Sequence, residues 1–194
     1  GVPGEWIEPK TGGTSQVLVY LHGGGYIGGS PATHRLMVGS LVRRSGFKAF
    51  VPDYRLAPEH QPPAQLEDAR AVFERIVEVH GVNNVVLAGD SAGGGLAVSL
   101  CCSLRDHHEP MPTPLALLSP WVDLVAPYPH EISERGATDI VMGADQIAAT
   151  AELLRPGHRA DPDISPIYAD LRGLPPTLIQ VGGAELIGIQ GEHQ

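Results

Sequence analysis

The stretch VVLAGDSAGGG, residues 85–95, places a G-x-S-x-G motif directly after a short apolar run. The run at 85–88 has the composition of a buried strand, and the apolar segment after the motif has helical spacing. A serine between a strand and a helix lies on a sharp turn, where Gly89 and Gly93 let the two elements pack closely. The motif alone is common, so its position carries the prediction that Ser91 is a nucleophile.

The same rhythm of strand and helix continues along the chain and predicts an α/β fold. Apolar runs bounded by Gly, Pro or Asn occur at residues 17–21, 47–52, 85–88, 115–118 and 177–181. Helix-spaced stretches separate the first three, which predicts a mostly parallel sheet with helices on both faces. We expect one domain over residues 1–194, with functional residues at the carboxyl ends of the strands.

The segment 125–172 departs from this rhythm, being rich in Pro, His and acidic residues, with one helix expected at 143–154. We interpret it as an insertion over the sheet that forms a lid or pocket wall, although a plain surface connection fits the composition nearly as well.

Composition excludes several classes of partner. The formal charge is −9 with only 13 Lys and Arg, which argues against nucleic acid or an anionic membrane as a partner. No apolar run approaches the roughly 20 residues that span a bilayer. Cys101 and Cys102 are adjacent in an apolar run, so we expect two buried thiols, no disulfide and no metal site. A cytoplasmic protein is the expectation.

A second glycine-rich turn, HGGGYIGGS at residues 22–30, follows the first strand and has two interpretations. It contains the pattern G-x-G-x-x-G of a dinucleotide-binding loop, and Asp53 ends the next strand where a ribose-binding acid would stand. Alternatively, its glycines let backbone N–H groups converge on a negatively charged oxygen, with His22 anchoring the loop. The N–H of Ala92 at the helix start would join them. Only this second interpretation uses both glycine-rich turns, so a dinucleotide-dependent oxidoreductase ranks a distant third.

Several segments together resemble the hormone-sensitive-lipase family of α/β-hydrolases, particularly its bacterial carboxylesterases. They are HGGGYIGGS (22–30), DYRLAPEH (53–60), GDSAGG (89–94), LLSPWVDL (117–124) and DISPIYADLRGLPPTLIQVGGAE (163–185). The resemblance implies the α/β-hydrolase fold and a serine carboxylesterase that hydrolyses short- to medium-chain acyl esters through an acyl-enzyme. It implies no cofactor and a small-molecule ester as partner, and it leaves room for a homodimer.

Carried over by position, the resemblance makes Ser91 the nucleophile and Glu185 the acid that orients the catalytic histidine. The oxyanion hole would comprise Gly23, Gly24, Gly25 and Ala92, and the supporting residues would be Tyr54, Arg55 and Glu59. The side chain of Asp90 should point away from the serine hydroxyl. Alternative acids that stay open are Asp123, Asp139, Asp161 and Asp163.

The histidine that would act as the general base is the residue of this catalytic set that the sequence does not clearly provide. The α/β-hydrolase order is Ser, acid, His, and only His193 follows Glu185. The eight-residue tail could extend roughly 26 Å, but no element behind His193 holds it in place. We expect a chain that lacks part of an N-terminal cap and the C-terminal strand and helix, with impaired activity. The alternative function is a catalytically inactive small-molecule-binding protein on the same fold.

Overall fold

The computed structural model describes residues 1–125, 143–182 and 185. Within them lies a six-stranded sheet in the order β1-β3-β2-β4-β5-β6, in which β1 is antiparallel to β3 and all other neighbours are parallel. The strands are β1 (Gly4–Ile7), β2 (Val17–Leu21), β3 (Lys48–Pro52), β4 (Val85–Asp90), β5 (Leu115–Leu118) and β6 (Thr177–Gln180). The five apolar runs are therefore strands, within two residues of the predicted bounds.

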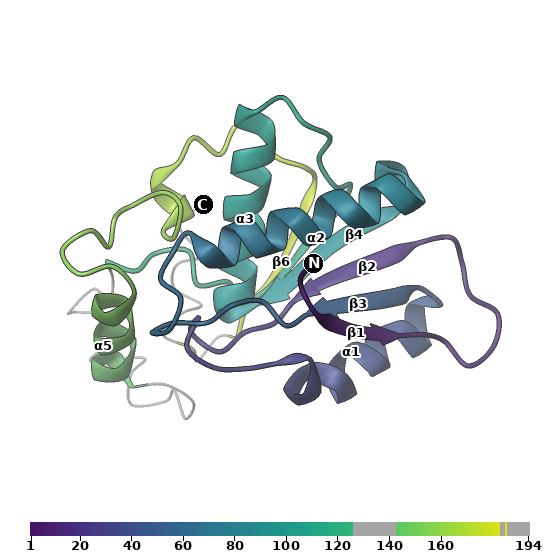
Figure 1. Ribbon diagram of the computed structural model, residues 1–194, viewed down its shortest axis with the longest axis horizontal. Helices are drawn as coiled ribbons and strands as arrows, with labels where there is room; N and C mark the ends of the chain where they lie inside the picture. The colour runs from purple at the N-terminus through teal and green to yellow at the C-terminus, as the bar shows by residue number, and fades with distance from the viewer. Residues whose placement is uncertain (126–142, 183–184, 186–194) are drawn as a thin grey trace.

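Helices cover both faces of this sheet, with α1 on one face and α2 and α3 on the other (Figure 1). The helices are α1 (Pro31–Ser45), α2 (Ala64–His80), α3 (Ser91–Asp106) and α5 (Ala144–Leu154), with 3-10 turns at Val82–Asn84 and Pro166–Tyr168. No helix among the described residues is long and apolar enough to cross a membrane.

Strand β2 shows why the strands are apolar without interruption. Successive side chains of a strand point to opposite faces of the sheet. Val17, Val19 and Leu21 pack in the core under α2 and α3, whereas Leu18 and Tyr20 pack on the other face with residues of α1. Both faces of β2 are buried, so apolar and aromatic side chains are favoured at every position of this strand. The predicted α/β fold is confirmed.

Strand β1 was not predicted. It lies at the edge of the sheet, where its residues alternate between exposed and half-buried, and Trp6 pairs with Phe50. Such a strand lacks the continuous apolar run of a buried one. Glu5 binds Arg35 of α1 at 2.6 Å, which ties this edge to the helix below it.

The inserted segment contributes to the core in its described part. Helix α5 begins one residue after the predicted start, and Ile147, Ala151 and Leu154 of this helix are buried in the same core as α2 and α3. The methyl group of Thr150 lies 3.3 Å from the position that a Cβ on Gly25 would take. The insertion therefore contacts the glycine-rich turn, and residues 126–142 lie outside the described part.

Candidate active site

Ser91 is the first residue of α3 and has φ +51°, in the left-handed region that a non-glycine residue rarely adopts. A strained backbone of this kind costs about 1–3 kcal/mol and persists where the surroundings enforce it. Here the Ser91 carbonyl accepts a hydrogen bond from the Trp121 N–H at 2.8 Å, which fixes the turn from the β5 side. The strand-turn-helix context predicted for the serine is present.

Glycines allow the serine turn to contact the end of β2. A Cβ on Gly93 would fall onto the carbonyl groups of Leu21 and His22, and a Cβ on Gly89 would collide with the Gly93 carbonyl. Any larger residue at either position would push β4, α3 and the first glycine-rich turn apart. The spacing of glycines around Ser91 is thus a packing requirement.

The first glycine-rich turn is a tight loop, not the start of a helix. Gly24 and Gly25 have φ of +127° and +63°, and the Gly24 carbonyl accepts hydrogen bonds from the N–H groups of Ile27 and Gly28. Helix α1 begins only at Pro31, capped by the Ser30 side chain. A dinucleotide-binding loop opens directly into its helix, so this geometry argues against that interpretation.

Three backbone donors at this edge have no acceptor in the part of the chain that the structure describes. The N–H groups of Gly24 and Gly25 have no hydrogen-bond acceptor among the described residues. The N–H of Ala92 lies in the first turn of α3, where the helix itself offers no acceptor. Free donors of this kind, on two turns that contact each other through Gly93 and His22, suit an incoming carbonyl oxygen that gains negative charge.

Gly23 departs from the expectation that it supplies an oxyanion donor. Its N–H donates to Oδ1 of Asp90 at 3.0 Å, so this donor is already occupied. The three glycines have different partners because successive peptide groups of the turn point in different directions. Gly23 is instead required for space, since a Cβ there would overlap the carboxylate of Asp90.

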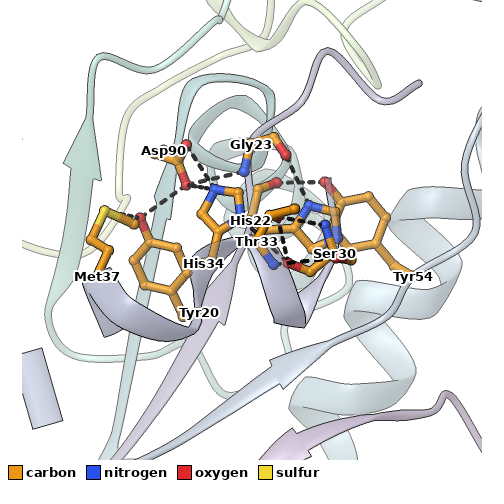
Figure 2. A network of polar contacts seen from close by, with 9 residues as sticks. All are labelled: Tyr20, His22, Gly23, Ser30, Thr33, His34, Met37, Tyr54 and Asp90. Atoms are coloured by element: carbon orange, nitrogen blue, oxygen red, sulfur yellow. Dashed lines mark hydrogen bonds and ion pairs between the residues drawn. The ribbon is translucent and has the colours of Figure 1, made fainter. Parts of the chain in front are cut away.

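Asp90 binds the turn through its side chain, as Figure 2 shows. Besides Gly23, it accepts from the Tyr20 hydroxyl at 2.9 Å and lies 3.3 Å from Nε2 of His34. Burial acts to raise the pKa of Asp90, but the hydrogen bonds from His34, Tyr20 and Gly23 outweigh it and leave the pKa below its usual range. The hydrogen bond to Asp90 raises the pKa of His34 against the opposing effect of burial.

His22 anchors the loop from inside. Its ring is fully buried and stacks on Tyr54 with 4.2 Å between ring centroids. Nδ1 lies 2.9 Å from the Gly23 carbonyl and is assigned as the donor because a carbonyl only accepts. Burial lowers the pKa of His22, which favours the neutral ring. The Tyr54 hydroxyl donates to the His22 carbonyl at 2.6 Å.

The other two expected supporting residues, Arg55 and Glu59, differ in their polar contacts. Arg55 binds Asp68 of α2 through its backbone N–H and its guanidinium, at 2.8 to 3.0 Å, and also contacts Glu67. Glu59 is exposed, and the described part of the chain shows no polar contact for it. Arg55 thus fixes the turn after β3 to α2, whereas a supporting role for Glu59 stays an expectation.

Glu185 lies at the same edge as Ser91. Its Oε2 accepts a hydrogen bond from the hydroxyl of Ser119, the residue that follows β5, the strand beside β4. The Ser119 N–H in turn donates to Gln180 at the end of β6. Sequence reasoning missed Ser119, although its place directly after an apolar strand is a signal that could have found it.

The alternative acids have other partners. Asp123 is buried and accepts from the Val125 N–H and the Tyr168 hydroxyl. Asp161 binds Arg155 at 2.9 Å and caps the N–H of Asp163. Asp139 lies outside the described residues. These partners of Asp123 and Asp161 lie in the inserted segment 125–172, whereas Glu185 is bound at the ends of β5 and β6.

His193, a candidate base by chain order alone, also lies outside the described residues. Among the described residues, no imidazole forms a hydrogen bond with Ser91 or Glu185. The described part of the chain also contains no group of three or more His, Cys, Asp or Glu that could hold a metal ion.

Comparison with known proteins agrees with this geometry. A family model described as an α/β-hydrolase fold matches residues 18–193. A crystal structure of a bacterial hormone-sensitive-lipase family esterase superposes with a TM-score of 0.94 and 40% identity, covering 99% of this chain and 65% of that one. The chain belongs to the hormone-sensitive-lipase family.

Curated relatives in this family carry names of ester-cleaving enzymes. An acetyl-hydrolase of Streptomyces hygroscopicus is 39% identical over 94% of this chain, and an esterase of Acinetobacter venetianus is 34% identical over 96% of it. The chain spans 61% and 62% of the length of these two relatives. As a hormone-sensitive-lipase family member, it therefore shares with them the part that holds both glycine-rich turns.

Proposed function

We propose that this chain carries the nucleophile, oxyanion hole and acid of a serine carboxylesterase for short- to medium-chain acyl esters. The observation that carries the proposal is the strained Ser91 at a helix start, on a turn that contacts the first glycine-rich turn through Gly93 and His22. In that glycine-rich turn, the N–H groups of Gly24 and Gly25 have no acceptor among the described residues. The names of the similar proteins support it. A cofactor has no part in the proposed reaction.

In the proposed reaction, Ser91 Oγ attacks the ester carbonyl and the N–H groups of Gly24, Gly25 and Ala92 bind the oxyanion. The N–H of Gly23 does not bind the oxyanion, because it donates to Asp90 and so helps to hold the turn in place. An imidazole accepts the serine proton and returns it to the leaving alcohol, and water then releases the acyl group by the same route.

Glu185 would orient this imidazole and stabilise its cationic form. Its hydrogen bond from Ser119 keeps the carboxylate at the edge of the sheet where the serine lies. His193 is the candidate base by chain order alone.

Hydrolysis of p-nitrophenyl acetate tests the proposal. We expect turnover whose kcat falls by about a millionfold in Ser91→Ala, the cost of removing the nucleophile of a serine hydrolase, while the oxyanion hole and substrate binding keep the variant about a thousandfold above the solution rate. Ser40→Ala on α1 is the matched control and keeps the wild-type rate. Equal rates for wild type and Ser91→Ala contradict the proposal.

A second function, binding of a small ester without turnover, is favoured by the absence of an imidazole bonded to Ser91 among the described residues. Calorimetry separates the two functions. Saturable binding of a non-hydrolysed ester, unchanged in Ser91→Ala, supports the binding protein, whereas a covalent acyl adduct seen by mass spectrometry supports the esterase.

Location and assembly are also part of the proposal. Cys101 and Cys102 are both buried and free, and burial raises the pKa of Cys101 to about 12, so neither thiol is reactive. Unpaired cysteines suit a reducing compartment, which supports a cytoplasmic location. A homodimer is compatible with this function, and light scattering in solution tests it.

A further inference from the structure

Asp90 joins three elements that meet behind the candidate oxyanion hole. It ends β4, its Oδ1 accepts the N–H of Gly23, and its carboxylate faces His34 on α1 (Figure 2). We propose that Asp90 is a positioning residue of the oxyanion turn, kept ionised by His34. This inference rests on the proposed esterase function, and it assigns to Asp90 a task separate from proton transfer.

The argument follows the peptide groups of the turn one at a time. A trans peptide is planar, so fixing its carbonyl also aims its N–H in the opposite direction. The peptide between His22 and Gly23 is held on both sides, its carbonyl by the Tyr54 hydroxyl at 2.6 Å and its N–H by Asp90 at 3.0 Å.

The next two peptides carry the candidate oxyanion donors. The Gly23 carbonyl is bound by His22 Nδ1, which aims the N–H of Gly24. The Gly24 carbonyl is bound by Ile27 and Gly28, which aims the N–H of Gly25. Asp90 therefore fixes the first of three consecutive peptide groups. A change in the orientation of that peptide would also change the orientation of the Gly24 and Gly25 N–H groups.

The charge of Asp90 strengthens this contact, because a hydrogen bond to a carboxylate is about twice as strong as one to a neutral acceptor. The titratable groups around it are His34 from α1, Tyr20 and His22 from the end of β2, and Tyr54 after β3. His34 is the group that can offset the negative charge, since the pKa of His22 is lowered by burial and the pKa of both tyrosines is raised by it. Nε2 of His34 at 3.3 Å thus favours the ionised carboxylate.

The experiment compares two substitutions of Asp90 by the kinetics of p-nitrophenyl acetate hydrolysis. Asp90→Ala removes the acceptor and should lower kcat by about 10- to 100-fold with KM changed less than about twofold, because misaligned donors weaken the transition state. Asp90→Asn keeps an oxygen for the Gly23 N–H and should stay within about fivefold of wild type. Wild-type kcat in Asp90→Ala, or equal losses in both variants, overturns the proposal.

A second measurement covers the cases in which Asp90→Ala does not fold or the wild-type chain hydrolyses nothing. Hydrogen exchange of the Gly23 amide, followed by NMR, should show protection in the wild type. As the pH falls, the protection factor, which is corrected for the intrinsic exchange rate, should drop at a higher pH in His34→Gln than in the wild type. The pKa of Asp90 rises when its cationic partner is gone, and a protonated carboxyl is a weaker acceptor than a carboxylate. Identical protection at every pH overturns the proposal. Absent hydrolysis together with the expected exchange pattern rejects the esterase function alone.

Discussion

Replacing Tyr54 by phenylalanine isolates one hydrogen bond that holds the first peptide of the oxyanion turn. Tyr54 is 2% exposed, and its hydroxyl is 2.6 Å from the His22 carbonyl. The substitution leaves the ring and its stacking on His22 in place, so no cavity forms beyond the hydroxyl. The lost hydrogen bond and the buried carbonyl left without it together cost about 1–3 kcal/mol in free energy of unfolding. For a chain of this size that lowers Tm by about 2–4 °C per kcal/mol.

Tyr26 provides a matched control. It is also 2% exposed, but its hydroxyl has no hydrogen bond among the described residues. Tyr26→Phe breaks no described hydrogen bond and should therefore leave the free energy of unfolding unchanged or raise it. Urea unfolding of both variants followed by far-UV circular dichroism gives the comparison. Equal effects of the two substitutions would refute the reasoning, since the hydrogen bond would then contribute nothing.

Two further predictions concern packing and pH. Gly95→Ala should lower the free energy of unfolding by about 1–3 kcal/mol, because the new Cβ would collide with the Trp121 carbonyl. Unfolding in urea measures this loss, and an unchanged midpoint would contradict the close contact. The folded-state pKa of His34 is raised, so its stabilising pair with Asp90 is fully present below the unfolded pKa of about 6.5 and is lost as the pH rises through the folded value. Wild type should accordingly be more stable than His34→Gln at pH 6, with the difference shrinking toward pH 9; a constant difference in thermal unfolding across this range would argue against the pair.

The sequence predicts the parallel strands and the two turns because each is encoded locally. The run at 85–88 is apolar because both faces of β4 are covered, and Gly89 is required by a contact with the Gly93 carbonyl four residues on. The contact of Gly93 with the carbonyl groups of Leu21 and His22 is not local, but the G-x-S-x-G pattern already places a glycine at that position. Strand β1 escaped prediction because an edge strand needs no continuous apolar run.

Contacts between distant segments could not be predicted in the same way. Asp90 contacts Gly23, which is 67 positions away in the sequence, and His34, which is 56 positions away. No spacing rule relates β4, the first glycine-rich turn and α1, because they come into contact only when the sheet has formed. The pattern H-G-G-G likewise does not show which N–H group donates to another residue of the protein. From the sequence, Gly23 is therefore expected in the oxyanion hole together with Gly24 and Gly25. The contact of Ser119 with Glu185 spans 66 positions and depends on β5 and β6 being neighbours.

The left-handed backbone of Ser91 also has a consequence for the stability of the fold. Glycine would adopt φ +51° without the penalty that serine carries, so a serine here lowers the stability of the fold. Natural proteins keep little stability in reserve, and mutations that relieve strain are readily found. The backbone strain and the hydroxyl that the proposed esterase would use as its nucleophile thus lie at the same residue, and such strain is common at functional sites.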